Sequence, residues 1–235
     1  MFHEDWLLMV IVAAGILLSV FFRKLTWSAA LLGGLICILI YSAAGWGRVA
    51  CMAAFFGIGI GVTSFRLKEK QAAGLAERDK GKRKAGQVFA NGAVAAIISV
   101  AACFFPFIKE QALVLIAACF ASATADTVSS EMGNIYGRRF YHVLSFKKVQ
   151  RGANGVVSAE GTGFGILGSM AIAVIYYCFE PSAPDSFIII IAGTLGNLLD
   201  SVLGAAFENR GYLSNDAVNF LNTAGAAIVA WLLVG

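Results

Sequence analysis

The sequence has few charged residues. Only 14% of its 235 residues are Asp, Glu, Lys or Arg, whereas a soluble domain has about 25%. Proline is also scarce, with 3 residues, which argues against a Pro-rich linker or a disordered chain. Hydrophobic residues make up 59% and the mean hydropathy is +0.77. This composition excludes a soluble globular protein and favours helices that cross a membrane.

Histidine is rare, and clustered cysteine is missing. The sequence has no CxxC motif, and its two histidines, His3 and His142, stand alone. The five cysteines all lie in or beside apolar runs: Cys37, Cys51, Cys103, Cys119 and Cys178. We expect them to be small packing residues rather than metal ligands or disulfide partners. The acidic start, residues 1–5, lacks the basic leader of a signal peptide, so we expect the first apolar run to be a retained span.

Eight apolar runs are long enough to cross a bilayer, which requires about 20 residues per helix. They cover residues 6–22, 28–45, 48–65, 87–106, 111–132, 156–179, 186–206 and 217–234. The fold class we predict is therefore all-α, a polytopic integral membrane helical bundle of about eight transmembrane helices. It forms a single membrane domain over 1–235, with a tight turn at 45–48.

The basic residues are distributed unevenly among the loops. Of the 18 Lys and Arg residues, all but Arg48 and Lys109 fall in loops that eight spans would place on one side. The positive-inside rule assigns that side to the cytoplasm. We therefore expect a plasma (inner) membrane protein with both termini outside and cytoplasmic basic loops at about 66–86 and 134–155. Such loops can also bind anionic lipid headgroups or nucleotide phosphates.

Carboxylates inside the predicted spans are costly in a membrane and are therefore candidate functional groups. Asp126 and Asp200 each lie 14 residues beyond the start of a run that enters from the outside, at Ala112 and Ser186. At 1.5 Å per residue, both lie about 21 Å along their helices, in the cytoplasmic third. Glu131 and Glu160 mark the ends of neighbouring spans at the same level.

Side-chain amides occur at the same depth as the aspartates. The residues concerned are Gln87, Asn91, Asn197, Asn215, Asn219 and Asn222. Helix capping explains Ser158 and Asn215, but it does not explain aspartates inside apolar helices. We therefore predict a water-accessible polar layer beneath the basic loops. Carboxylates with amide and hydroxyl oxygens suit Mg²⁺, and a proton or cation relay is the competing use.

A glycine-containing segment leads into the sixth predicted span. It runs from Arg151 through Gly152, Asn154 and Gly155 to a helix start near Ser158. Backbone N–H groups and the helix dipole at such a position can hold phosphate oxygens. Glycines in membrane helices also allow close helix packing, so this segment alone has two interpretations.

Five motifs together resemble one family. They are KAGQVFANG at 84–92, ADTVSSEMG at 125–133, GANGVVSAEGT at 152–162, GNLLDSVLG at 196–204 and NDAVNF at 215–220. In this order they resemble the domain-of-unknown-function 92 family, which includes transmembrane protein 19, over nearly the whole chain. That family is similar to the plant and cyanobacterial phytyl-phosphate kinases, and more distantly to the phytol and dolichol kinases.

The resemblance implies an enzyme, a nucleotide-dependent phosphotransferase of isoprenoid metabolism. Those kinases phosphorylate an isoprenoid alcohol or its monophosphate with a nucleoside triphosphate, often CTP. We expect a membrane-embedded prenyl-phosphate kinase that acts on a monophosphate such as phytyl phosphate at the cytoplasmic face. The expected partners are a lipid-phosphate substrate, a nucleotide and the membrane, with no nucleic acid. The prenyl chain length, the choice of CTP or ATP and the oligomeric state stay open.

Roles for the polar layer follow from this expectation. Asp126, Glu131 and Asp200 would bind the predicted cofactor Mg²⁺, directly or through water. Asn91, Asn197 and Asn219 would orient the phosphates and complete the predicted catalytic set. The expected phosphate- and nucleotide-binding residues are Lys84, Gln87, Lys148, Arg151, Gly152, Asn154, Gly155, Ser158, Glu160 and Asn215. No general base is required, because the oxygen of an acceptor monophosphate is already anionic.

The main alternative is a transporter or flippase for an anionic lipid or small anion. The same charged layer at helix starts could form a binding site with alternating access. Against it, the carboxylates lie toward one face, and the outer halves of spans four to eight offer mainly Ser99, Ser122 and Thr194. A CDP-alcohol phosphotransferase is a weaker alternative, because the spaced Asp series of those enzymes is absent.

Overall fold

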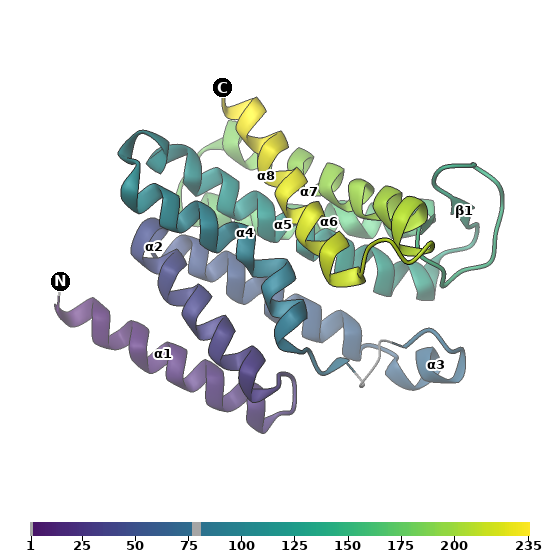
Figure 1. Ribbon diagram of the computed structural model, residues 1–235, viewed down its shortest axis with the longest axis horizontal. Helices are drawn as coiled ribbons and strands as arrows, with labels where there is room; N and C mark the ends of the chain where they lie inside the picture. The colour runs from purple at the N-terminus through teal and green to yellow at the C-terminus, as the bar shows by residue number, and fades with distance from the viewer. Residues whose placement is uncertain (1, 77–80) are drawn as a thin grey trace.

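The computed structural model describes residues 2–76 and 81–235, with side chains from Trp6 onward. Arg78 and Lys80, two of the predicted loop charges, lie outside the described residues. The long helices are α1 (Phe2–Phe21), α2 (Trp27–Ser64), α4 (Ala85–Phe104), α5 (Lys109–Tyr136), α6 (Ala159–Phe179), α7 (Ala183–Leu203) and α8 (Asn215–Val234). They form one bundle (Figure 1), which confirms the predicted all-α membrane fold.

Shorter elements connect these helices. They are the helix α3 (Leu67–Ala72), the 3-10 turn η2 (Pro106–Ile108), the π-helical turn η3 (Gly204–Glu208) and the strands β1 (Tyr141–His142) and β2 (Val156–Val157). The two strands pair antiparallel, with Tyr141 opposite Val157, and hold the loop between α5 and α6 together. Two of these elements, α3 and β1, therefore lie in the loops that the sequence marks as basic.

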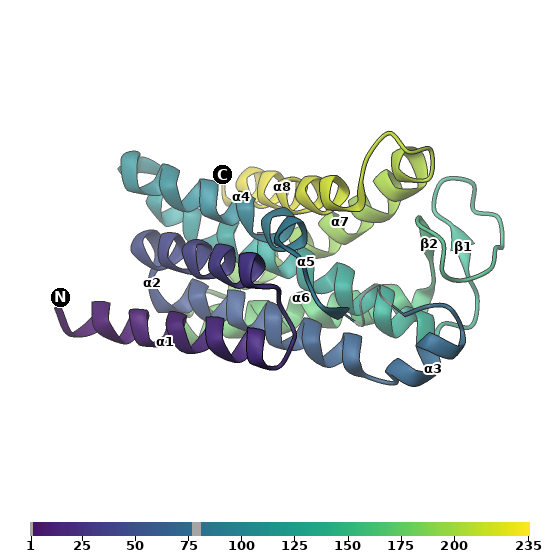
Figure 2. The same ribbon diagram turned by 60° about the horizontal axis from the view of Figure 1, so that its bottom comes forward.

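Helix α2 is a hairpin of two spans rather than one long helix. Gly45 has φ 67° and ψ −168°, a conformation that glycine adopts without steric cost. The chain reverses there (Figures 1 and 2), at the predicted tight turn. Six of the described helices are long and apolar enough to cross a membrane. Together with the second arm of α2 and the shorter apolar helix α1, they account for the eight predicted runs.

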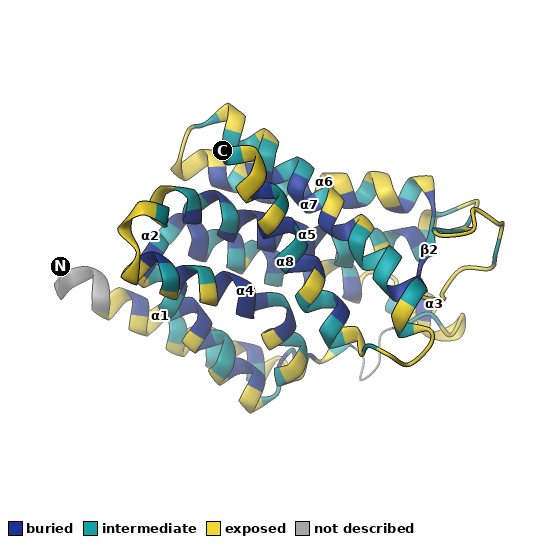
Figure 3. Ribbon diagram, turned by 45° about the horizontal axis from the view of Figure 1, so that its top comes forward, coloured by how far each residue is buried: buried dark blue, intermediate teal, exposed yellow. Residues whose placement is uncertain are grey.

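Helix α5 occupies the centre of the bundle. It contacts α2, α4, α6, α7 and α8, and 72% of its most apolar stretch is buried. Figure 3 shows this buried centre, with exposed residues on the outer helices. Small residues permit the close packing, because a Cβ on Gly168 of α6 would lie 3.3 Å from the Cα of Ala125. Residues of α5 are therefore surrounded by helices on most sides.

The four loops that carry most of the basic residues lie at one end of the bundle. There, the backbone N–H of Thr26 donates to the carbonyl of Arg83, joining the first basic loop to the second. The amide of Asn209 donates to the carbonyl of Asn154 at 3.0 Å, joining the third to the fourth. The two termini lie toward the opposite end (Figures 1 and 2). The assignment of the loop end to the cytoplasm stays a prediction.

Arg48 anchors the opposite end and is not a loop residue exposed to solvent. Its side chain is 2% exposed, and Nε donates to the Leu113 carbonyl at 3.2 Å. Nη1 forms an ion pair with Glu180 at 3.3 Å, and the guanidinium lies 4.8 Å from the centroid of the Tyr176 ring. This one cation therefore ties α2 to α5, α6 and the turn before α7.

Replacing Arg48 should destabilise the bundle. We expect Arg48→Met to lower the free energy of unfolding by about 2 kcal/mol, because it removes two hydrogen bonds and a cation–π contact and leaves Glu180 without its ion-pair partner. Thermal unfolding of the purified protein in detergent measures the change. Lys109→Met is the matched control, since Lys109 is exposed at the same end of the bundle. Equal stability of the two variants would contradict the anchoring role.

Candidate functional site

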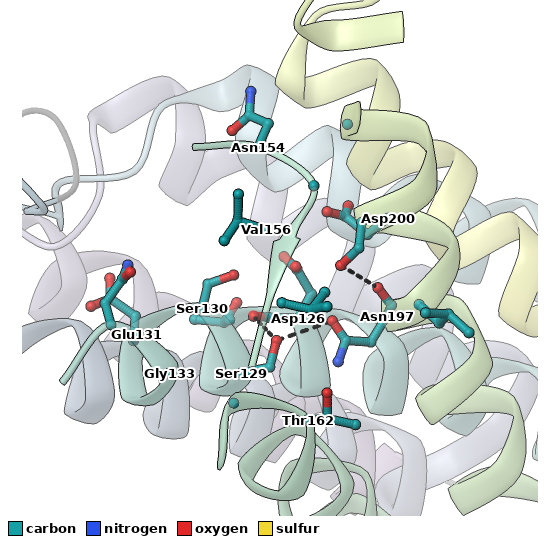
Figure 4. A pocket seen from close by; sticks show the side chains of 18 of the residues that line it. Asp126, Ser129, Ser130, Glu131, Gly133, Asn154, Val156, Thr162, Asn197 and Asp200 are labelled. Carbon is teal, nitrogen blue, oxygen red and sulfur yellow. Dashed lines mark hydrogen bonds between the residues drawn. The ribbon is translucent and has the colours of Figure 1, made fainter. Parts of the chain in front are cut away.

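A polar cavity of about 400 Å³ lies at the loop end of the bundle, among α4, α5, α6, α7, α8 and the loop before α6. Figure 4 shows part of its lining. It brings together most of the side chains that the sequence predicts for the site: Gln87, Asn91, Asp126, Glu131, Gly152, Asn154, Gly155, Ser158, Asn197, Asp200, Asn215 and Asn219. Six separate segments of the chain therefore contribute to one polar space.

Asp126 of α5 and Asp200 of α7 form the acidic centre of the cavity. Their carboxyl groups lie next to each other. The amide of Asn222 donates to Oδ1 of Asp200 at 3.1 Å, and Oγ of Ser122 donates to Oδ1 of Asn222 at 2.5 Å. Both Ser122 and Asn222 are fully buried. A chain of polar groups therefore supports the aspartate pair from inside the bundle.

A second set of hydrogen bonds fixes the amides around the aspartates. Oγ of Ser129 donates to Oδ1 of Asn197 at 3.1 Å and also contacts the carbonyl of Asp126 at 3.2 Å. Figure 4 shows this link between α5 and α7. The amide of Asn91 donates to the carbonyl of Gln87 one turn earlier, at 2.9 Å. The Asn197 carboxamide is thus held by the same helix that carries Asp126.

Arg83 is a lining residue that the sequence prediction missed. It is only 9% exposed, and its guanidinium is near enough to Asp126 for electrostatic attraction. The same guanidinium lies 5.1 Å from the centroid of the Phe55 ring. Arg83 stands between Lys82 and Lys84 in the sequence, so the pattern shows a loop charge rather than a buried cation. In the structure it supplies positive charge to an otherwise acidic cavity.

Glu208 is the second lining residue that was missed. The predicted seventh span ends at 206, but η3 continues the helix in π-helical form through Glu208. Asn154 and the carboxylate of Glu208 both lie within 4 Å of the Cβ position of Gly204, so this carboxylate faces the glycine-containing segment. A π-helical turn is common at functional sites, yet its position has no clear pattern in a single sequence.

The glycine-containing segment forms one wall of the cavity. Gly152 and Gly155 have φ values of 97° and 74°, which favour glycine. A Cβ on Gly155 would overlap Ala205, so the loop can approach η3 only without a side chain there. Ser158 then begins α6, with its Oγ accepting from the N–H of Gly161 at 3.0 Å. The N-terminus of α6 therefore borders the cavity, as the sequence suggests.

Four predicted binding residues do not line the cavity. Lys84 is exposed at the start of α4, and Lys148 is exposed in the loop beside β1. Arg151 donates through Nη1 to the Asn134 carbonyl at 2.7 Å, which fastens the loop to the end of α5. Glu160 is half-buried in the first turn of α6. In addition, Ser214 rather than Asn215 caps α8, by accepting from Ala217.

Glu131 lines the cavity but does not join the aspartates. Its carboxylate pairs with Lys70 of α3, which is 3% exposed and also donates to the carbonyls of Val62 and Thr63 at 3.0 and 2.8 Å. Figure 4 shows Glu131 apart from Asp126 and Asp200. Within residues 2–76 and 81–235, no three Asp, Glu, His or Cys side chains are grouped so that they could hold a metal ion. The expected three-carboxylate set is therefore not assembled.

Asn222 should position Asp200 rather than contact a ligand, because it does not line the cavity. We expect Asn222→Ala to lower the free energy of unfolding by about 2 kcal/mol, since it leaves Ser122 and one Asp200 oxygen without their partner. Asn222→Asp should be worse, because it brings a third carboxylate to the aspartate pair. Thermal unfolding measures both changes. Unaltered melting of Asn222→Asp would contradict donation from the Asn222 amide to Asp200.

A bundle of apolar helices with an acidic cavity at one end defines an integral membrane protein with a buried polar site. Its family follows from sequence comparison. The chain belongs to the integral membrane protein family DUF92, whose family model matches residues 10–227.

Relatives occur in plants, cyanobacteria and archaea. The chain is 33% identical over 229 residues to the chloroplastic protein VTE6 of Arabidopsis thaliana, covering 94% of this chain and 64% of VTE6. It is 35% identical over 195 residues to an uncharacterized membrane protein of Synechocystis sp., covering 81% of this chain and 76% of that protein. An uncharacterized membrane protein of Methanocaldococcus jannaschii is 31% identical over 83% of this chain and 79% of its own length. No solved structure matches the chain significantly.

Proposed function

We propose that this protein is a prenyl-phosphate kinase. It transfers a phosphoryl group from a nucleoside triphosphate, such as CTP, to an isoprenoid monophosphate, such as phytyl phosphate. The observation that carries the proposal is the Asp126–Asp200 pair, which lies with Arg83 in a polar cavity at the end of an apolar bundle. Family membership and the similarity to VTE6 support it. The chain spans 64% of the length of VTE6. The kinase activity is therefore proposed for this chain and is not carried over from the whole of VTE6.

The position of the cavity suits an amphiphilic acceptor. A prenyl phosphate keeps its tail in the hydrocarbon region and its headgroup at the polar boundary. The cavity lies at that boundary, next to the basic loops, where a soluble nucleotide can enter. We place this end in the cytoplasm by the positive-inside rule. The two substrates would then meet from opposite directions, the lipid from the bilayer and the nucleotide from water.

The donor set around the aspartates fits a magnesium–nucleotide complex. Mg²⁺ is typically bound through one or two carboxylates together with substrate phosphates and water, and Asp126 and Asp200 supply two adjacent carboxylates. When bound there, Mg²⁺ would neutralise negative charge on the nucleotide phosphates and on the acceptor phosphate during phosphoryl transfer. Glu131 is left out of this set because Lys70 already holds it.

The remaining groups bind and orient the phosphates. Arg83 attracts the phosphates from the α2 side of the cavity, and Asn91, Asn197 and Asn219 offer neutral hydrogen-bonding groups. The N–H groups at the start of α6 can donate to anionic oxygens at the opposite wall. Because the acceptor oxygen of a monophosphate is already anionic, positioning and charge neutralisation supply the catalysis without a general base.

A transporter or flippase is less well supported. The cavity lies at one end of the bundle, and at the opposite end Arg48 ties α2 to the Leu113 carbonyl and to Glu180. A transport route would have to break these contacts in each cycle. Purified protein in vesicles should therefore move prenyl phosphates across the bilayer no faster than empty vesicles do.

The decisive assay uses the purified protein in detergent. It is incubated with Mg²⁺, labelled nucleoside triphosphates and phytyl, farnesyl or geranylgeranyl monophosphate, and lipid products are separated. We expect prenyl diphosphates from at least one pair, with the free alcohols unreacted because they would need a base. The absence of diphosphate from every pair, together with nucleotide-independent lipid movement in vesicles, would refute the kinase and favour the flippase.

A further inference from the structure

A second cavity, of about 200 Å³, lies between α1, both arms of α2 and α4. Its lining is apolar or small almost throughout, and glycines from three helices provide the space: Gly15, Gly33, Gly34 and Gly92. Ile11 at its border is 43% exposed on the outside of the bundle. The cavity therefore faces the region that the hydrocarbon of the bilayer would occupy.

Arg83 lines both cavities. Its backbone pairs with the loop that joins α1 to α2, and its guanidinium lies against Phe55 and against Gly59 of α2. A side chain at Gly59 would overlap the guanidinium, so a glycine is needed for this placement. The buried cation therefore stands where the apolar cavity meets the acidic one.

We infer that the apolar cavity holds the isoprenoid chain of a lipid monophosphate, with the phosphate next to Arg83. That the lipid tail is an isoprenoid rests on the proposed function. That the ligand has one apolar tail and an anionic headgroup is inferred from the lining of the cavity. Charge complementarity selects the head, since Arg83 is the charged residue in the lining of the apolar cavity. The phosphate then enters the polar cavity from the side of α4, facing Asp126.

The dimensions of the cavity suit part of such a chain. Its lining residues on the first arm of α2 and the turn before it run from Leu25 to Cys37, which corresponds to about 18 Å along a helix. Several isoprene units fit in that length, and the rest of a longer chain can leave past Ile11 into the bilayer. Each buried methylene adds to affinity, so the first units of the chain should contribute most of the binding.

A photolabelling experiment tests the site independently of catalysis. Purified protein in nanodiscs is irradiated with a farnesyl phosphate analogue that carries a diazirine in its terminal isoprene unit, and the labelled peptides are mapped by mass spectrometry. We expect label on the cavity residues of α1, the first arm of α2 and α4. Farnesyl phosphate should compete strongly, and farnesol or a phosphatidic acid with two acyl chains weakly.

Gly33→Leu is designed to fill the cavity without disturbing the fold. A Cβ on Gly33 would have only Val88 nearby, at 3.8 Å, so the larger side chain can project into the empty space. Gly57→Leu is the matched control, because Gly57 lies on the second arm of α2, has no heavy atom within 4 Å of its Cβ position and does not line the cavity. We expect Gly33→Leu to lower labelling about tenfold and Gly57→Leu to leave it unchanged.

Kinase assays give the second readout. Gly33→Leu should shift the preference from geranylgeranyl to geranyl phosphate and leave the KM for the nucleotide unchanged. Unaltered chain preference and unaltered labelling in Gly33→Leu, or label confined to other helices, would refute the site. Equal competition by phosphatidic acid would also refute it, in favour of a structural lipid. If the protein is labelled as expected but has no kinase activity, the proposed function would be refuted, whereas the binding site for the isoprenoid tail would still be supported.

Discussion

Asp126→Asn and Asp200→Asn should each reduce phosphoryl transfer at least about a thousandfold, the scale of losing a group that stabilises transition-state charge. Asparagine has nearly the same shape as aspartate but carries no negative charge, so it cannot replace a carboxylate beside a magnesium–nucleotide complex. Initial rates at saturating nucleotide and prenyl phosphate measure the effect. The loss should appear in kcat, because the phosphates can still reach Arg83 and the surrounding amides.

Thermal stability should distinguish this loss from misfolding. The two carboxylates are in contact inside a membrane bundle, and two negative charges at that distance repel each other. Removing one charge should therefore leave the melting temperature unchanged or raise it. Glu110→Gln is a suitable control, since Glu110 is exposed at the far end of α5 and should retain full activity. Wild-type turnover by Asp126→Asn would contradict the assignment of the pair.

Lys70→Met should produce the largest loss of stability, about 3 kcal/mol. Lys70 donates to two carbonyls at the end of α2 and pairs with Glu131 of α5. Methionine fills the same space but donates nothing, so it leaves Glu131, whose side chain is 12% exposed, as an unpaired charge. Thermal or denaturant unfolding in detergent measures the change. Lys68→Met, on the exposed face of α3, should have little effect.

The same pair decides the role of Glu131. If the carboxylate is structural, the double variant Lys70→Met/Glu131→Leu should be more stable than Lys70→Met, because no charge is then buried alone. Glu131→Gln should melt earlier but retain the turnover of each folded molecule. If Glu131→Gln loses turnover at an unchanged melting temperature, Glu131 would instead be a magnesium ligand, as the sequence predicts.

Apolar run length and loop charge are enough to predict the arrangement of helices. Each predicted span has its helix, and the reversal at 45–48 occurs at Gly45, where the backbone conformation requires glycine. Helix ends are less well predicted. α5 continues to Tyr136 and the seventh span to Glu208, because polar residues near a membrane boundary do not stop a helix whose side chains face a water-accessible cavity.

The depth of polar residues also predicts most of the cavity lining, since residues at one level on packed helices converge. The direction of each side chain cannot be predicted in this way. Arg83 and Arg48 have the sequence positions of loop charges, yet both are buried by helices distant in the sequence. Depth in the membrane groups Glu131 with Asp126, but the partner of Glu131 is Lys70, a residue of the short helix α3 that depth alone cannot place.

The central position of α5 bears on how the protein is made. Synthesis proceeds from the N-terminus, so α5 is complete before α6, α7 and α8 exist to cover it. During that interval Asp126 has no Asp200 beside it, and an aspartate inside a span costs up to about 2.5–3.5 kcal/mol on the insertion scale, the upper value being that at the span centre. The alanine-rich remainder of α5 must offset this cost until the later helices arrive. The acidic cavity is therefore the last part of the bundle to be completed during biogenesis.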